Sequence, residues 1–386
     1  MFEILLKASF WFFLALVSTV IATKLRLATA LTEIAVGAVA SLVIATTGIS
    51  PGENDIWIKF IAGVGAIMLT FLAGAELEPD VLKTRWKETL GIGLIAFLAP
   101  FLGCTAVAYY ILDWSTKASW LAGVALSTTS VAVVYAVMLE LGLNKTEFGK
   151  VILAACFVND LGTVIALGLI FSPFTTKSLI FIGLTIVLAI LVPIITPKIF
   201  KKFGNKPSEF ETKYLLFMLF GLGATALWSG SEAVLPAYII GMVLAGTVGK
   251  DYQLIRRLRT LTIGFLTPIY FLRAGYFVSI PSIIAAPLAL LVLLGGKMIT
   301  KITGVYPVTK LFKFRHKEGM YTTLLMSTGL TFGSISALFG LTHGIIDQIQ
   351  YSLLIAAVIG SAVIPTIIAN AFYLPKYLLP KTKKED

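Results

Sequence analysis

The sequence contains few charged residues for its length. Asp, Glu, Lys and Arg make up only 13% of the 386 residues, whereas hydrophobic residues make up 58% and the mean hydropathy is +0.92. A soluble globular chain usually carries about a quarter charged residues, because these residues cover the surface that faces water. The composition therefore excludes a soluble enzyme and a disordered protein, and it favours a chain that lies within a lipid bilayer.

Histidine and cysteine are equally scarce, with two of each. His316 and His343 stand in predicted loops on opposite sides of an apolar segment, so neither a Ser–His pair nor a His-rich metal cluster is expected. Cys104 and Cys156 lie far apart in apolar segments, which indicates small packing residues and not a disulfide framework. Because the sequence also has no Walker-type glycine-rich loop, we expect neither ATP nor any other cofactor.

Long uncharged runs are what the sequence has in abundance. A helix needs about 20 apolar residues to cross a bilayer. Six runs reach this length without Asp, Glu, Lys or Arg: 89–112, 118–139, 178–197, 274–296, 319–346 and 348–375. Shorter runs lie at 8–23, 34–52, 60–75, 214–231 and 233–249, and two further apolar segments lie at roughly 147–171 and 260–278. The pattern predicts an all-α polytopic membrane protein, surrounded by lipids, with about 13 transmembrane helices.

The basic residues predict how these helices are oriented. Lys and Arg in short loops stay on the cytoplasmic side of a membrane. Alternate connections, counted from the end of the first helix and including the C-terminal tail, carry 24 of the 31 Lys and Arg residues, and the intervening connections carry 3. This distribution predicts a cell-membrane protein with its N-terminus outside and its C-terminus in the cytoplasm. Because the positive charge is spread over the loops, no nucleic-acid partner is expected.

Two similar segments about 200 residues apart indicate an internal repeat. Ser127 and Thr128 correspond to Ser327 and Thr328, and seven helices separate the two segments, so the repeats have opposite orientations. Inverted repeats are frequent in secondary transporters, whose substrate sites lie near the bilayer midplane. Hydroxyl side chains, with Gly329 beside the second pair, bond backbone groups that a broken helix sets free. We therefore expect two interrupted helices, the alternative being ordinary packing of Ser and Thr between helices.

Asp160 lies near the centre of the sixth predicted helix. A central Asp opposes membrane insertion by about 2.5–3.5 kcal/mol, so an acidic residue at this depth is a candidate functional site. Burial favours the protonated carboxyl group, which suits the exchange of a proton for a small cation.

Lys297 is expected to face Asp160 from the helix before the second interrupted one. Its amine has three predicted partners: the Asp160 carboxylate, the side-chain oxygen of Asn159, or the dipole ends of the broken helices. Two alternatives remain open, a purely structural pair of Asp160 with Lys297 and an amine that reaches the membrane surface.

Three other charged residues are weaker candidates. Glu76 is expected near the cytoplasmic end of the third helix, where solvation of the helix end explains it equally well. Glu232 is expected near an end of the ninth helix, either in an outer vestibule or at the membrane boundary. Arg273 lies deeper in the tenth helix and requires a partner that the sequence does not identify.

These motifs together resemble the monovalent cation:proton antiporter superfamily, and within it the NapA- and GerN-like Na+/H+ antiporters. The resemblance rests on ALSTTSV at 125–131, ELG at 140–142, AACFVND at 154–160 and GK at 296–297. It covers nearly the whole chain and implies an NhaA-like antiporter fold. It also implies that Asp160 binds the cation and the proton competitively, as a transient Na+ site, with Asn159, Thr129 and Ser130 beside the ion and Lys297 compensating charge.

The resemblance further implies a division of the chain. Residues 1–80 and 212–278 would form a scaffold through which two copies make a homodimer. Residues 88–171 and 281–373 would form an ion-translocating core that moves like an elevator, and residues 178–200 would be the helix that links the two parts.

One departure from the NapA pattern bears on stoichiometry. Asn159 stands where electrogenic relatives have a second Asp, which leaves one titrating carboxylate. One carboxylate suggests one proton per Na+, so we hypothesise electroneutral exchange. A Lys297 amine that also titrates would alter this stoichiometry. The sequence thus predicts a gradient-driven antiporter and not an enzyme, with Na+ as substrate and Li+ or K+ still open. The alternatives are a K+/H+ efflux antiporter of the same fold and, from other classes, a non-transporting receptor or an intramembrane enzyme.

Overall fold

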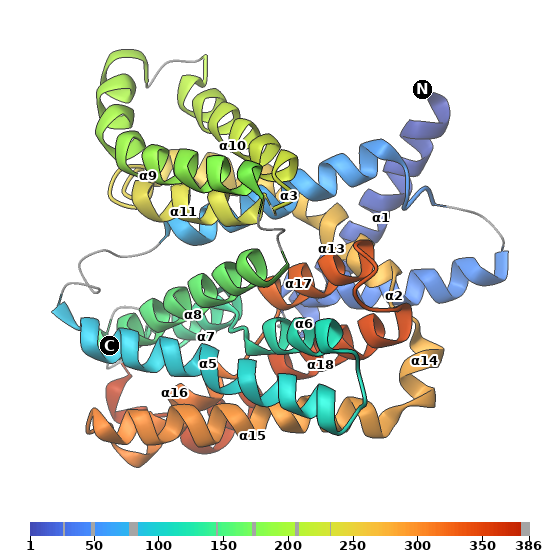
Figure 1. Cartoon of the computed structure of the whole chain (residues 1–386), viewed down its shortest axis with the longest axis vertical. Coiled ribbons are helices and arrows are strands. Elements are labelled where there is room, and N and C mark those ends of the chain that lie inside the picture. The colour runs from blue at the N-terminus through green and yellow to red at the C-terminus, as the bar shows by residue number, and fades with distance from the viewer. Residues whose placement is uncertain are drawn as a thin grey trace, which may run out of the picture.

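The computed structural model of the chain describes residues 1–25, 28–47, 51–76, 84–143, 146–171, 175–204, 208–231 and 233–379. All regular structure in these ranges is helical, and the helices form two groups that lie side by side (Figure 1). The first group contains α1 (Phe2–Leu25), α2 (Thr29–Thr47), α3 (Ile56–Ala75), α9 (Thr176–Phe203), α10 (Phe210–Trp228), α11 (Val234–Leu244), α12 (Tyr252–Leu261) and α13 (Thr267–Tyr276), with α9, α10 and α11 at the upper left of the view. The second group contains α5 (Trp86–Tyr110), α6 (Thr116–Ser127), α7 (Val131–Glu140), α8 (Glu147–Phe171), α14 (Ile280–Ala285), α15 (Pro287–Leu311), α16 (His316–Met326), α17 (Thr331–Thr342) and α18 (Gln348–Ile368).

The predicted number of membrane crossings agrees with these helices. Within the described ranges, nine helices are long and apolar enough to cross a membrane when α16 and α17 are taken together. The shorter α2 and α11, the pair α6 and α7, and the π-helix Thr262–Leu266 together with α13 correspond to the remaining four predicted spans. The prediction of an all-α polytopic protein is therefore confirmed.

Packing within each group is closer than packing between the groups. In the first group, α3 packs on α11 and α13, and α2 packs on α13. Small residues allow this approach, because a Cβ atom on Gly241 of α11 would overlap the carbonyl oxygen of Phe71 on α3. In the second group, α5 packs on α6, α8 and α15. Each group thus has its own set of helix contacts, and α9 packs on α10 and α11 of the first group.

Prolines determine where several helices begin. Ala286 has φ −129° and ψ 55° because the residue before a proline is disfavoured in the helical region. Pro287 then occupies the first position of α15, where a missing N–H costs no hydrogen bond. The eleventh helix consequently begins and ends later than the uncharged run 274–296, and its centre lies at Lys297 and Lys301. This boundary is a correction to the expectation from charge alone.

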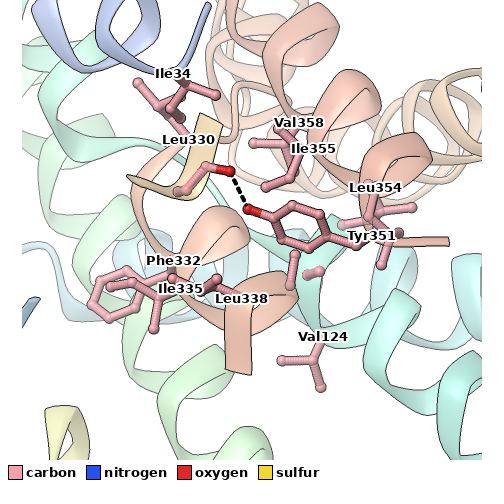
Figure 2. Close-up of a cluster of buried hydrophobic side chains, with 14 of the residues drawn as sticks. Ile34, Val124, Leu330, Phe332, Ile335, Leu338, Tyr351, Leu354, Ile355 and Val358 are labelled. Atoms are coloured by element: carbon pink, nitrogen blue, oxygen red, sulfur yellow. Dashed lines mark hydrogen bonds between the residues drawn. The ribbon is translucent and has the colours of Figure 1, made fainter. Parts of the chain in front are cut away.

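A cluster of buried hydrophobic side chains packs against the second interrupted helix. Figure 2 shows Leu330, Phe332, Ile335 and Leu338 of that helix against Tyr351, Leu354, Ile355 and Val358 of α18, with Val124 of α6 and Ile34 of α2. All ten side chains are buried. The cluster fixes the position of α17 against α6 and α18, and through Ile34 it reaches the first group of helices.

Candidate functional site

The first interrupted helix breaks between α6 and α7. Thr128 adopts φ −63° and ψ 152°, an extended conformation that ends α6 at Ser127. The hydroxyls of Ser127 and Thr128 donate to the carbonyl oxygens of Val124 and Ala125 at 2.8 and 3.1 Å. The side chains at the break therefore satisfy carbonyl groups at the end of the helix, as required inside a membrane.

The second interrupted helix breaks in the same way between α16 and α17. The Ser327 hydroxyl donates to the carbonyl of Thr323 at 2.8 Å, and the Thr328 hydroxyl donates to that of Leu325 at 2.7 Å. Leu330 then adopts φ −150° and ψ −71° before α17 begins. The structure confirms the two predicted interruptions, and the matching Ser–Thr pairs act on the backbone of their own helices.

The two breaks cross and bond to each other. The Ser130 N–H donates to the Thr328 carbonyl at 3.0 Å, and the Thr129 hydroxyl donates to the Met326 carbonyl at 2.7 Å. Every residue from Ser127 to Ser130 is buried, as are Ser327 and Thr328. Backbone groups freed by one break are thus satisfied at the other, which joins the two repeats at one point in the membrane.

Asn159 of α8 binds both sides of the first break. Its Oδ1 accepts from the Thr129 N–H at 2.9 Å, and its Nδ2 donates to the Ser127 carbonyl at 3.1 Å. The side chain is fully buried. Both amide atoms therefore hold the break in shape, and a role for Asn159 as a cation ligand stays a prediction.

Asp160 follows directly on α8 and is 2% exposed. Its Oδ1 has no hydrogen-bond partner in the part of the chain that the structure describes. A buried carboxylate oxygen without a partner is costly, so a proton or a cation at this oxygen stabilises the site. Asp160 is next in sequence to Asn159, which binds both sides of the first break, and its role as the ion-binding residue stays a prediction.

Lys297 is also buried, but it does not bind Asp160. Its Nζ donates to Ser361 Oγ of α18 at 3.0 Å, and no ion pair joins it to the Asp160 carboxylate. A Cβ atom on Gly329 would overlap this amine. The amine therefore lies against the second break, which corresponds to the predicted position at the broken helices, and full burial excludes an amine at the membrane surface.

Lys301 is a functional candidate that the sequence interpretation missed. It lies one turn after Lys297 on α15, is fully buried, and donates from Nζ to Thr129 Oγ1 at 3.1 Å. The spacing of four residues places both amines on one face of a helix. That signal was present in the sequence, but the uncharged run 274–296 placed Lys301 beyond the expected helix.

A pocket of about 570 Å³ opens between the two groups of helices. Its walls come from α3, α7, α8 and α12, and include Glu76, Tyr135, Lys150, Phe157 and Arg259. Glu76 follows the last residue of α3 and binds Arg259 of α12 at 2.8 Å. The pocket thus reaches Phe157, three residues before Asp160, and Glu76 lies at its charged rim and not at the crossing of the breaks.

Arg273 and Glu232 are not brought to this site. Arg273 is 6% exposed and donates from Nε to the carbonyl of Glu53 at 2.7 Å, near the start of α3, while its guanidinium lies 4.8 Å from the ring centre of Phe277. The partners of Arg273 that the sequence did not identify are therefore the Glu53 carbonyl and the Phe277 ring. Arg273 lies near the start of α3, whereas Glu76 lies at the other end of that helix. Glu232 lies outside the described residues.

The chain is similar to known membrane proteins over most of its length. The family described as sodium/hydrogen exchanger, transmembrane, matches residues 12–372. A probable Na(+)/H(+) antiporter 3 of Methanocaldococcus jannaschii is 28% identical over 352 residues, which cover 86% of this chain and 89% of that protein. Cation/H(+) antiporter 17 of Arabidopsis thaliana is 27% identical, and the aligned residues cover 83% of this chain but 42% of the plant protein.

A solved structure is similar in fold. The sodium proton antiporter MjNhaP1 of Methanocaldococcus jannaschii matches with a TM-score of 0.72, covering 95% of this chain and 97% of its own. At 17% sequence identity this match shows the arrangement of the helices, and it confirms the predicted antiporter fold.

Proposed function

The chain belongs to the transmembrane sodium/hydrogen exchanger family, and from this premise we propose that it exchanges Na+ for H+ across the cell membrane by alternating access. The observation that carries the proposal is the buried Asp160 carboxylate, whose Oδ1 has no partner among the described residues. A proton or a dehydrated monovalent cation satisfies this oxygen, and one carboxylate does not hold both. Occupation by one substrate therefore requires release of the other.

A pH-sensitive dye in acidified everted vesicles tests this function. Addition of Na+ is expected to release protons from the vesicles and to restore dye fluorescence, and Li+ is expected to act more weakly or equally. A response to K+ with none to Na+ would replace the proposal by K+/H+ efflux. Vesicles that contain the protein and respond to none of the three ions would contradict antiport and leave the receptor interpretation.

We propose that Thr129 and Ser130 help to coordinate the ion beside Asp160. The Thr129 hydroxyl donates to the Met326 carbonyl, so its oxygen lone pairs point away from that bond. The first break also places the Ser130 hydroxyl at the start of α7, where its oxygen accepts from the Val133 N–H at 3.4 Å. Oxygen ligands are the kind that small hard cations prefer, which supports this assignment.

We further propose that the pocket beside Glu76 faces the cytoplasm. The distribution of basic residues supports an N-terminus outside and a C-terminus inside. Lys250 and Arg259, which belong to a lysine- and arginine-rich connection, both line this pocket. On this orientation, cytoplasmic water in the pocket would reach Phe157, three residues before Asp160 on α8.

We propose that alternating access occurs by movement of the second group of helices against the first. In this proposal α9 links the two groups, and the first group forms a homodimer with a second copy of the chain. Among the described residues, buried hydrogen bonds cross between the groups at two places. Tyr238 donates to the Phe157 carbonyl at 2.8 Å, and Tyr351 donates to the Ala274 carbonyl at 2.5 Å (Figure 2). An elevator movement has to break both bonds. Light scattering from the purified protein tests the homodimer, and a monomeric mass would contradict it.

A cross-link between the groups tests the movement itself. A Cβ atom on Gly168 of α8 would lie 3.1 Å from Leu235 Cδ2 of α11. We expect a short cross-linker that attaches to both thiols through disulfide bonds, in a variant carrying both Gly168→Cys and Leu235→Cys, to stop exchange, because α8 is then fixed to α11. Cleavage of the cross-link by a reductant should restore transport, and the single variants serve as controls. Full transport by cross-linked protein would rule out this movement.

Electroneutral exchange is the proposed stoichiometry, supported by the single carboxylate of Asp160 beside an uncharged Asn159. One proton per Na+ moves no net charge, so the rate should not depend on membrane voltage. Proteoliposomes with a K+ diffusion potential of either sign should give the same Na+-driven proton flux within about 20% as at zero potential. A flux that follows the potential would instead indicate that a lysine releases a second proton.

A further inference from the structure

Another pocket lies near the start of α3, at the end of that helix opposite to Glu76. Its volume is about 470 Å³, within the range of roughly 300–1,000 Å³ that small-molecule sites occupy. We name it the Arg273 pocket, and it is lined by Asn54, Lys59, Arg273, Phe277, Leu341 and Thr342. None of these residues belongs to the proposed ion site, so the pocket requires an explanation of its own.

The Arg273 guanidinium is held in place but keeps N–H donors for a ligand. The side chain is 6% exposed, its Nε donates to the Glu53 carbonyl at 2.7 Å, and its Cζ lies 4.8 Å from the ring centre of Phe277. These contacts fix the position of the guanidinium plane. In the described ranges its two terminal Nη groups donate no hydrogen bond. A buried guanidinium that lines a pocket with unused donors is suited to bind an anion there.

Positive charge at the Arg273 pocket is only partly balanced. Lys59 in the first turn of α3 is exposed, and neither Lys59 nor Arg273 enters an ion pair within the part of the chain that the structure describes. Glu53 interacts electrostatically with Arg273 but does not line the pocket. Asp55, the next acidic residue, is paired with Lys7 at 2.9 Å. Two cations beside one acidic side chain therefore leave a pocket that attracts negative charge.

The donors of the pocket match the oxygens of a phosphate group. A guanidinium binds two phosphate oxygens through parallel N–H bonds, and a lysine ammonium adds a point charge. The Asn54 amide, which lines the same pocket, supplies a further N–H donor. We propose that the Arg273 pocket binds a phosphate group, from free phosphate or from the headgroup of an anionic phospholipid, and that the bound group slows exchange.

The walls of the pocket connect binding to the movement of the two groups of helices. The first group supplies Lys59 and Arg273, and the end of α17 in the second group supplies Leu341 and Thr342. Movement of α17 against α3 changes this pocket, so the phosphate binds the present arrangement more tightly than the moved one and favours it. This step rests on the proposed exchange by alternating access, whereas the binding of phosphate does not.

Thermal unfolding of the purified protein tests the binding, with inorganic phosphate as the probe. We expect the phosphate salt of N-methylglucamine to raise the unfolding midpoint above that in its chloride salt at the same pH and ionic strength. Phosphate also stabilises proteins in general, because it is excluded from their surfaces. Variants therefore decide the test. Arg273→Gln should raise the half-maximal phosphate concentration by about tenfold, the usual effect of removing a charge-assisted hydrogen bond.

Lys117→Gln is the matched control, since it removes an exposed lysine of α6 that does not line the pocket. Its response to phosphate should equal that of the unaltered protein. The same rise in midpoint in Arg273→Gln as in the unaltered protein would contradict a phosphate site at Arg273, because the stabilisation would then be the general effect of the salt.

Thr342→Trp gives a second test that keeps both cations. Thr342 is exposed at the end of α17, and its hydroxyl donates to the carbonyl of Leu338 within the same helix. We expect tryptophan to fill the pocket and to remove the specific response to phosphate without loss of the fold. If Arg273→Gln does not fold because its bond to Glu53 is lost, Thr342→Trp decides alone. An unaltered phosphate response in Thr342→Trp would place the site elsewhere and overturn the proposal.

Uptake of radioactive Na+ into proteoliposomes tests the slowing of exchange and separates the two sources of phosphate. In phosphatidylcholine vesicles, saturating inorganic phosphate on both sides should lower Na+ uptake by about fivefold or more in the unaltered protein and not in Arg273→Gln. Replacement of about a fifth of the lipid by phosphatidylglycerol, without added phosphate, tests the headgroup. A fall in only one of these arms identifies that source.

The outcomes distinguish this inference from the function on which it rests. Absence of Na+ uptake by the unaltered protein in phosphatidylcholine vesicles without phosphate would contradict the proposed exchange, and the thermal measurements would still decide whether phosphate binds. Uptake that neither phosphate nor phosphatidylglycerol lowers would contradict the slowing of exchange by the Arg273 pocket. An equal fall in Arg273→Gln and in the unaltered protein would contradict it as well, since the effect would then not pass through that guanidinium.

Discussion

Replacement of Asp160 by Asn is expected to abolish cation-driven proton movement while the protein still folds and inserts. Asparagine has the same shape but neither binds a transported proton nor carries a charge for the cation. A neutral amide is also less costly in the membrane than a carboxylate. Exchange in proteoliposomes should fall by at least about 100-fold, a loss of about 2.7 kcal/mol or more in transition-state stabilisation.

Two measurements make the Asp160→Asn result specific. The thermal unfolding midpoint should stay unchanged or rise, because Oδ1 loses no hydrogen bond in the described part of the chain. Asp55→Asn is the matched control, since Asp55 pairs with Lys7 at 2.9 Å at a partly exposed position. That control should transport normally. Sustained exchange in Asp160→Asn, above the background of empty liposomes, would remove Asp160 from the mechanism.

The sequence predicted the features that depend on local chemistry. A central Asp and paired Ser–Thr segments are visible without a structure, because each is unusual inside a long apolar run. The positions of both breaks follow from Ser127, Thr128, Ser327 and Thr328, whose hydroxyls bond carbonyl groups three or four residues earlier. These contacts are local in the chain, so local sequence determines them.

The partners of the lysines depend on contacts that are distant in sequence. Lys297 binds Ser361 and Lys301 binds Thr129, at separations of 64 and 172 residues. The start of α15 at Pro287 and the packing of α15 on α5 and α18 determine which break each lysine amine contacts. Counting charges placed one lysine near Asp160, but the register of α15 places two lysines in the interior. For the same reason Tyr238, an uncharged residue of α11, gave no signal of its bond to Phe157.

Asn159→Ala is the second substitution with a large expected effect. Alanine removes the acceptor of the Thr129 N–H and the donor to the Ser127 carbonyl, and both backbone groups are buried. Each unsatisfied group costs about 1–3 kcal/mol, so the free energy of unfolding should fall by about 2–6 kcal/mol. The thermal midpoint in detergent should drop by several degrees. Exchange should fall with it, because Thr129 is then no longer held beside the ion.

Asn159→Asp separates the two hydrogen bonds of this side chain. Its oxygen still accepts from Thr129, but an ionised carboxylate places a second oxygen against the Ser127 carbonyl, where a donor is required. A protonated carboxyl group restores that donor, so the stability of this variant should rise toward that of the unaltered protein as the pH is lowered, whereas that of Asn159→Ala should not. If both variants unfold at the same temperature as the unaltered protein at every pH, then the first break does not depend on Asn159. The shape of the ion site would in that case come from the hydroxyl bonds of Ser127 and Thr128 alone.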